Sequence, residues 1–152
     1  MDKVLNILPG EGFCSLLFGS SMSQAEKYFG KPQEIVVLDD IDEYKSTVWH
    51  YWERGFSLFF DEKIPKRFCC VEIDNLESEM WGKKIFYLME KQVIELLKSK
   101  GIKTHEIEKQ EWGEKRITFD EINIDFYFEN NNLVSINYGK ISAVEPLLIL
   151  SN

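Results

Sequence analysis

The two histidines, His50 and His105, are the first candidates for chemistry in this 152-residue sequence. His50 lies in an aromatic stretch, and His105 is followed by Glu106 and Glu108. Neither histidine has a cysteine or carboxylate partner at the spacing typical of a metal site. We therefore expect structural or surface roles for both histidines, and the sequence predicts no metal ligand.

The adjacent cysteines Cys69 and Cys70 suggest redox chemistry, but they lack the spacing of a CxxC motif. Neighbouring residues of a strand point to opposite faces, so we expect two separate, small thiols that are buried or partly exposed. With Cys14 the number of cysteines is odd, which does not indicate a disulfide framework. This cysteine usage favours a reducing cytoplasm.

The segment FGSS (18–21) precedes a predicted helix, where unpaired backbone N–H groups can bind an anion. A helix cap explains the same hydroxyl groups without a ligand, since Ser23 followed by Glu26 fits a capping box. P-loop, GxGxxG and GxSxG motifs are absent from the sequence. The sequence therefore predicts no catalytic residue and no cofactor, and we expect a protein that is not an enzyme.

Composition indicates a single globular domain over 1–152, with 44% hydrophobic, 14% aromatic and 29% charged residues. The formal net charge of −8 disfavours nucleic-acid binding, because phosphates would be repelled. The same charge permits electrostatic steering onto a basic partner, and the acidic clusters at 39–43 and 72–79 fit such a face. No apolar run is long enough for a secretion signal or a membrane helix, so we expect a cytoplasmic protein without membrane contact.

Hydrophobic spacing predicts the same order of elements twice. A helix at 24–29 precedes strands at 33–38, 47–53, 56–62 and 68–74; helical spacing within 80–101 precedes strands at 102–108, 114–119, 122–128 and 133–138. We therefore predict an α+β fold of two tandem repeats, at 10–75 and 78–140, each with one helix and about four antiparallel strands. The helices should pack on one sheet face, and 141–152 should form a C-terminal strand or tail.

Alternation along the strands predicts which side chains face away from the helices. A two-residue turn at Arg54-Gly55 would place Tyr51 opposite Leu58 and Trp49 opposite Phe60 under the helix. The outward residues that we select as partner-binding candidates are His50, Trp52, Phe59, Phe68, Glu72, Asp125 and Tyr127. Arg116 should form a surface ion pair with Asp125. A terminal tail covering the first half's outer face is the alternative, and a one-residue register error would exchange the two faces.

The stretch GFCSLLFGSSMSQAEKYFGKP, followed by strands carrying WHYWERGFSLFFDE, resembles small bacterial proteins built from helix-plus-antiparallel-sheet units. The tandem arrangement resembles the β-lactamase inhibitory protein architecture, and similar openings occur in immunity proteins that neutralise toxins used between competing bacteria. The chain departs from the secreted inhibitor by lacking a signal segment and an even number of cysteines.

The resemblance carries over no catalytic residue. It implies a cytoplasmic immunity protein that binds and occludes a cognate protein toxin, which should be basic. A nuclease toxin is a natural candidate, because an acidic inhibitor mimics the charge of nucleic acid. The alternative is a small-molecule-binding or stress-related α+β domain with a pocket between helix and sheet. The oligomeric state is not predicted.

Overall fold

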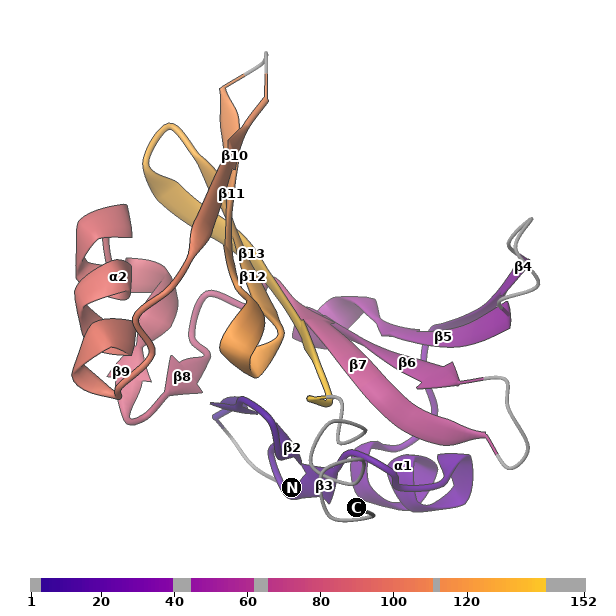
Figure 1. Ribbon diagram of the computed structural model, residues 1–152. Coiled ribbons are helices and arrows are strands. Elements are labelled where there is room, and N and C mark those ends of the chain that lie inside the picture. Colours follow the sequence, from indigo (N-terminus) through magenta and orange to yellow (C-terminus); the bar gives the residue numbers. More distant parts are fainter. Residues whose placement is uncertain (1–3, 40–44, 62–65, 111–112, 142–152) are drawn as a thin grey trace.

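The dominant element of the protein is an eight-stranded antiparallel sheet, seen in a computed structural model that describes residues 4–39, 45–61, 66–110 and 113–141. Its strand order is β10-β11-β12-β13-β7-β6-β5-β4 (Figure 1). The strands are β4 (Glu34–Asp39), β5 (Lys45–Tyr51), β6 (Phe56–Asp61), β7 (Arg67–Ile73), β10 (Glu106–Lys109), β11 (Glu114–Phe119), β12 (Ile124–Glu129) and β13 (Asn132–Gly139).

The two halves of the chain meet in the middle of this sheet. Strands β4–β7 and β10–β13 each follow one another as neighbours, and the last strands of the two runs, β7 and β13, pair antiparallel with Glu72 opposite Asn137. From this central pair the two four-stranded halves diverge (Figure 1). The prediction of an α+β fold is confirmed. The sheet is larger than predicted, because the strands of both halves form one continuous sheet of eight strands.

A smaller sheet joins the N-terminal segment to the middle of the chain, in the order β3-β2-β1-β8-β9. It is made of β1 (Asn6–Leu8), β2 (Gly12–Phe13), β3 (Leu16–Leu17), β8 (Glu79–Met80) and β9 (Lys83–Lys84). The central contact is parallel, with Ile7 opposite Met80. We did not predict these strands, because two or three residues are too few to show an alternating pattern.

The helices α1 (Met22–Phe29) and α2 (Glu90–Ser99) and the small sheet lie on one side of the large sheet (Figure 1). Tyr51 donates a hydrogen bond from this side to the Gly30 carbonyl oxygen after α1, at 2.8 Å. Lys115 forms an ion pair of 2.8 Å with Glu90 in the first turn of α2. The inward side chains of the sheet therefore contact both helices.

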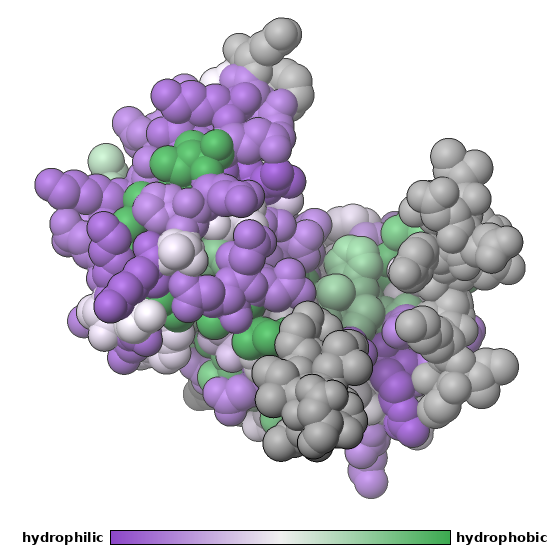
Figure 2. Space-filling view, in the orientation of Figure 1, coloured by the Kyte–Doolittle hydropathy of each residue, from purple (hydrophilic) through white to green (hydrophobic). Residues whose placement is uncertain are grey.

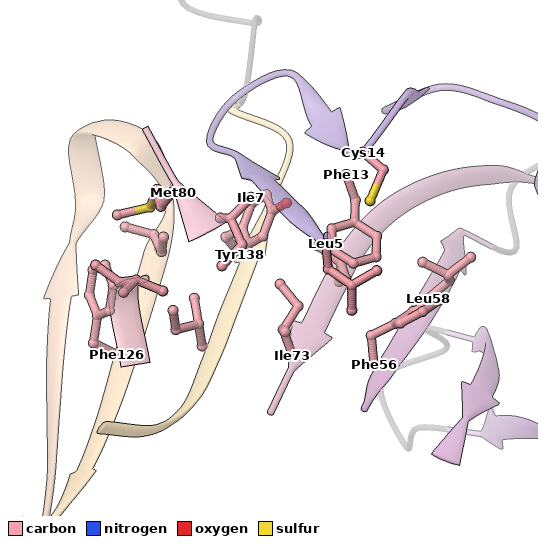
Figure 3. Packing of buried hydrophobic residues seen from close by; sticks show 14 of the residues in the cluster. Leu5, Ile7, Phe13, Cys14, Phe56, Leu58, Ile73, Met80, Phe126 and Tyr138 are labelled. Carbon is pink, nitrogen blue, oxygen red and sulfur yellow. The ribbon is translucent and has the colours of Figure 1, made fainter. Parts of the chain in front are cut away.

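One hydrophobic core fills the space between the large sheet and the covering elements. Figure 3 shows Tyr138 of β13 beside Ile7 of the small sheet. The Tyr138 hydroxyl donates to the Gly12 carbonyl oxygen at 2.7 Å and accepts from the Leu8 N–H at 3.3 Å. Phe13 packs edge-on against Phe56, with ring centroids 4.9 Å apart. The core is therefore shared by both halves of the chain.

Helix α1 is capped two residues before the predicted position. Ser21 Oγ accepts the Gln24 backbone N–H at 3.1 Å, and Gln24 Oε1 accepts the Ser21 N–H at 2.8 Å. The capping box is thus Ser21 with Gln24, and the prediction of Ser23 with Glu26 is wrong. Both pairs fit the same motif, and burial of Ala25 and Phe29 selects the frame that turns the apolar face to the sheet.

The continuous helical spacing read within 80–101 is broken in the structure. Its first part forms the β8–β9 hairpin and a 3₁₀ turn, η2 (Ile85–Tyr87), before α2 begins at Glu90. The hairpin turn places Trp81 and Gly82 at φ 52° and 77°, which a helix cannot contain. Only Val93 and Leu97 of α2 are fully buried.

The turn between β5 and β6 is longer than predicted. A 3₁₀ turn, η1 (Trp52–Arg54), ends at Gly55 in the left-handed region, so Tyr51 lies opposite Phe56 and Trp49 opposite Leu58. The register differs from the predicted one by two residues, and an even shift keeps every side chain on its predicted face. The predicted C-terminal strand or tail at 141–152 lies, after Ile141, outside the described residues.

Candidate protein-binding face

A row of polar side chains crosses the large sheet on the side away from the helices. Strand pairing places one residue of each strand in this row. In spatial order the row is Glu34, His50, Ser57, Glu72, Asn137, Asp125, Thr118 and Glu106. We call this side of the sheet the open sheet face; seven of the eight side chains reach solvent on it, whereas Ser57 is buried. Four of the eight are carboxylic acids, so the face is acidic.

The neighbouring row of residues points to the opposite face of the sheet, towards the helices. Its members alternate with the polar row and are apolar: Tyr51, Phe56, Ile73, Ile136, Phe126, Ile117 and Ile107. All but the edge residue Ile107 are buried. Adjacent positions on the same strands therefore point into the core and onto the open sheet face.

Space-filling representation shows the surface hollowed between the part formed by β10–β13 and the part formed by β4–β7 (Figure 2). The divergence of the two half-sheets from the β7–β13 pair explains this shape (Figure 1). A convex part of another protein fits such a surface better than a flat one does.

Trp52 is the most prominent aromatic side chain on the open sheet face, with 58% of its surface exposed. Its indole stacks on His50 at a centroid distance of 4.0 Å, and its Nε1–H donates to Glu34 Oε1 at 3.1 Å. His50 Nδ1 in turn lies 2.7 Å from Ser57 Oγ. These contacts hold an exposed indole in one orientation.

Two acidic side chains lie next to Trp52. A small cavity of about 40 Å³ is lined by Trp52, Gly55, Phe56, Ser57, Glu72 and Asp74. Glu72 and Asp74 are both exposed. The predicted residues His50, Trp52 and Glu72 are thus brought together by the pairing of β5, β6 and β7.

The second half of the face is polar and internally bonded. Arg116 ion-pairs with Glu108 at 2.6 Å, and Asp125 accepts a hydrogen bond from the Thr118 hydroxyl at 2.5 Å. The predicted Arg116–Asp125 pair is wrong, because the 3₁₀ turn η3 (Asp120–Ile122) shifts the register and places Arg116 opposite Tyr127.

Tyr127 lies on the open side of β12, opposite Ser135 of β13. Partial burial and the nearby Asp125 carboxylate raise the pKa of Tyr127. The phenol is therefore protonated at neutral pH and can donate a hydrogen bond. Asp125 and Tyr127 are placed together, as predicted, on the half of the sheet that does not carry Trp52.

Phe68 does not belong to this surface. Its side chain is fully buried and lies 4.9 Å from the ring of Phe18 and 6.1 Å from that of Phe60, so the prediction that it faces outward is wrong. A β-bulge is the reason: Phe59 pairs with Cys70 and Phe60 with Phe68, which leaves Cys69 as an extra residue. Phe59, which lies before the bulge, is half-buried on the open side as predicted.

The bulge also overturns the prediction for the cysteines. Cys69 and Cys70 do not alternate as regular strand neighbours do, because Cys69 is the extra residue of the bulge, and both side chains are half-buried. The pKa of Cys69 is raised and that of Cys70 lowered, in both cases mainly by interaction with the neighbouring thiol, and Lys140 also lowers the pKa of Cys70.

Several residues of the open sheet face were missed by our selection from the sequence, above all Glu34, Asn137, Thr118 and Glu106. The signal was present for Thr118 and Asn137, which alternate with apolar neighbours, whereas Glu34 precedes an unbroken apolar run at 35–38. The polar row becomes continuous only because β13 pairs with β7 and joins the two halves into one sheet. No local sequence pattern predicts this pairing.

A second hollow lies on the other side of the sheet. A cavity of about 410 Å³ between α1 and β5 is lined by Met22, Ser23, Glu26, Lys27 and Trp49. Within the described residues, no group of three or more histidine, cysteine or acidic side chains is placed to hold a metal ion. In the same ranges, no helix is long and apolar enough to cross a membrane.

The FGSS segment uses its polar groups within the fold. The Gly19 N–H donates to the Phe68 carbonyl oxygen at 2.8 Å, and the Ser20 N–H to that of Leu17 at 3.1 Å. Ser21 caps α1. These contacts support a capping role for the segment rather than an anion site. Comparison of the chain with protein-family models, with curated proteins and with solved structures returns no match.

Proposed function

We propose that the protein is a binding protein without catalytic activity, most specifically a cytoplasmic immunity protein that uses the open sheet face to occlude a basic protein toxin. The observation that carries this proposal is the polar row over all eight strands, with carboxylates at four positions and a fixed indole beside them. An acidic, hollowed surface attracts a basic partner and accelerates its association.

The two halves of the face would contribute differently to such a complex. Trp52 supplies a large, oriented apolar contact of the kind that dominates interface energetics. The carboxylates of Glu72, Asp125 and Glu106 supply charge, which contributes to orientation and association rate. A nuclease is a fitting target, because its substrate site is itself built for a polyanion.

Correspondences between the two halves support the further proposal that they are tandem repeats, in an arrangement like that of the β-lactamase inhibitory protein. Each half has a helix before four consecutive strands. The 3₁₀ turns end at left-handed Gly55 and Asn123, and the ladder irregularities follow Phe59 and Tyr127. The separation in sequence between Gly55 and Asn123 equals that between Phe59 and Tyr127.

The test is binding to the product of a toxin gene located beside the gene for this chain. Calorimetry with the purified pair should show an affinity that falls as the salt concentration rises. Trp52→Ala should weaken binding by about thirtyfold or more, as expected for an interface anchor. Glu72→Gln should weaken it by about tenfold, mainly through slower association.

Glu95→Gln is the matched control, because Glu95 is an exposed carboxylate on α2, on the opposite side of the large sheet. It should leave the affinity unchanged. Equal affinities for wild type, Trp52→Ala and Glu72→Gln, or binding that ignores salt, would refute the open sheet face as the site.

The cavity between α1 and β5 favours a second candidate function, the binding of a small molecule. Its volume of about 410 Å³ is within the range of ligand pockets. Thermal-shift screening with metabolites tests this candidate. A ligand that raises the melting temperature of wild type, but not that of Lys27→Met, would support it; Lys98→Met on α2 serves as the charge-matched control.

A further inference from the structure

The β-bulge in β7 brings two sulfur atoms to the same side of the large sheet. Regular pairing would separate the side chains of Cys69 and Cys70, but the extra residue at Cys69 removes the alternation at this point. The Cys69 S–H donates to the Phe59 carbonyl oxygen, which lies 3.4 Å from Sγ, and Cys70 pairs with the same Phe59 across the strands. The two thiols are therefore neighbours in space as well as in sequence.

The surroundings leave room for a ligand on these sulfurs. Cys70 pairs with Gly139 of β13, and a Cβ atom at that position would lie only 2.8 Å from Cys70 Sγ. Glycine thus keeps the space beside the sulfur open. Both cysteines are half-buried, so reagents can reach them, whereas Cys14 is buried in the core.

Charge favours the reactive form of one thiol. Interaction with the neighbouring Cys69 thiol and with the nearby Lys140 lowers the pKa of Cys70, which raises the share of thiolate there at neutral pH. The thiolate is the form that binds metals and attacks electrophiles.

We propose that Cys69 and Cys70 form a two-sulfur chelating site for a soft, thiophilic metal or metalloid centre. Soft thiolate ligands select such centres over hard cations. Cys70 lies on the same side of β7 as Glu72, but the thiol site does not rest on the function proposed above. With phenylarsine oxide as the probe, two As–S bonds form and the As–O bond breaks. The oxygen leaves as water with the two thiol protons, and no atom changes oxidation state.

Intact-mass spectrometry of the folded protein with one equivalent of phenylarsine oxide tests the proposal. The adduct should persist in excess 2-mercaptoethanol, because a chelate resists a competing monothiol, and should be removed by the dithiol dithiothreitol. Cys69→Ser and Cys70→Ser should each reduce retention by about a hundredfold, since the second sulfur acts at a high effective concentration.

Cys14→Ser is the control and should retain the adduct fully. Gly139→Ala keeps both thiols but crowds Cys70, so it should weaken retention while circular dichroism shows a folded protein. An adduct that is lost to monothiol, that survives in Cys69→Ser, or that forms only in urea would overturn the site.

Discussion

The Tyr138 hydroxyl connects β13, in the middle of the large sheet, with Leu8 and Gly12 of the N-terminal segment. Burial raises the pKa of Tyr138 well above that of an exposed tyrosine, and burial together with Glu26 raises the pKa of Tyr51 to about 12. Both groups thus keep their protons in the folded state at pH values where the unfolded chain ionises, from about pH 10.

We therefore expect the free energy of unfolding to fall as the pH rises above about 10, because the unfolded chain then binds fewer protons than the folded one. The contribution of these tyrosines is complete below that pH. Urea midpoints can be measured from about pH 8 to about pH 12, on both sides of the ordinary tyrosine pKa of about 10. They should decline less steeply with pH in Tyr51→Phe and in Tyr138→Phe than in wild type. Slopes identical to wild type would contradict the assignment.

At the scale of the single helix, the position of the cap can be tested directly. Ser21→Ala removes the acceptor for the Gln24 N–H and should destabilise the protein by about 1 kcal/mol. Ser23→Ala, which changes the serine that we had predicted as the cap, should have an effect close to zero. Urea denaturation followed by circular dichroism measures both, and a larger loss for Ser23→Ala would reject the observed cap.

The bulge in β7 places Phe68 in the core, and the stability of variants can test this placement. Phe68→Ala empties a fully buried site and should lower the free energy of unfolding by about 3–5 kcal/mol. Phe59→Ala, on the half-buried outward side of the neighbouring strand, should cost clearly less. Chemical denaturation of the two variants distinguishes them, and equal losses would mean that Phe59 and Phe68 share one environment.

Long strands of this protein were predictable and short elements were not. The predicted 114–119 strand coincides with β11, and the others agree within a few residues, because alternation over six or seven positions is a strong signal. The bulge at Cys69 has no local signal of this kind, so Phe68 was assigned to the open side and the two cysteines to opposite faces. Of the selected residues, all but Phe68 lie on the predicted side of the sheet, because alternation alone determines that side where no bulge intervenes.

At the scale of the molecule, the β7–β13 pair and the shared core couple the two halves. We expect Leu58→Ala to lower stability by about 2–5 kcal/mol and to destabilise both halves together. Hydrogen exchange should accelerate for amides of β12 as well as β6, and urea should produce one transition. Two separate transitions would show that the halves unfold independently.

The ends of the large sheet differ in what they offer another strand. The outermost strand β10 carries Glu106, Glu108 and Lys109, whose charges discourage pairing. At the other end, β4 exposes Ile35, Val37 and Leu38 along a six-residue strand. Edge-to-edge association through β4 would join two copies and leave the charged β10 strands as the outer edges of the joined large sheets. Growth through the edges of the large sheet would then stop at a pair of molecules and leave the open sheet face of each copy accessible.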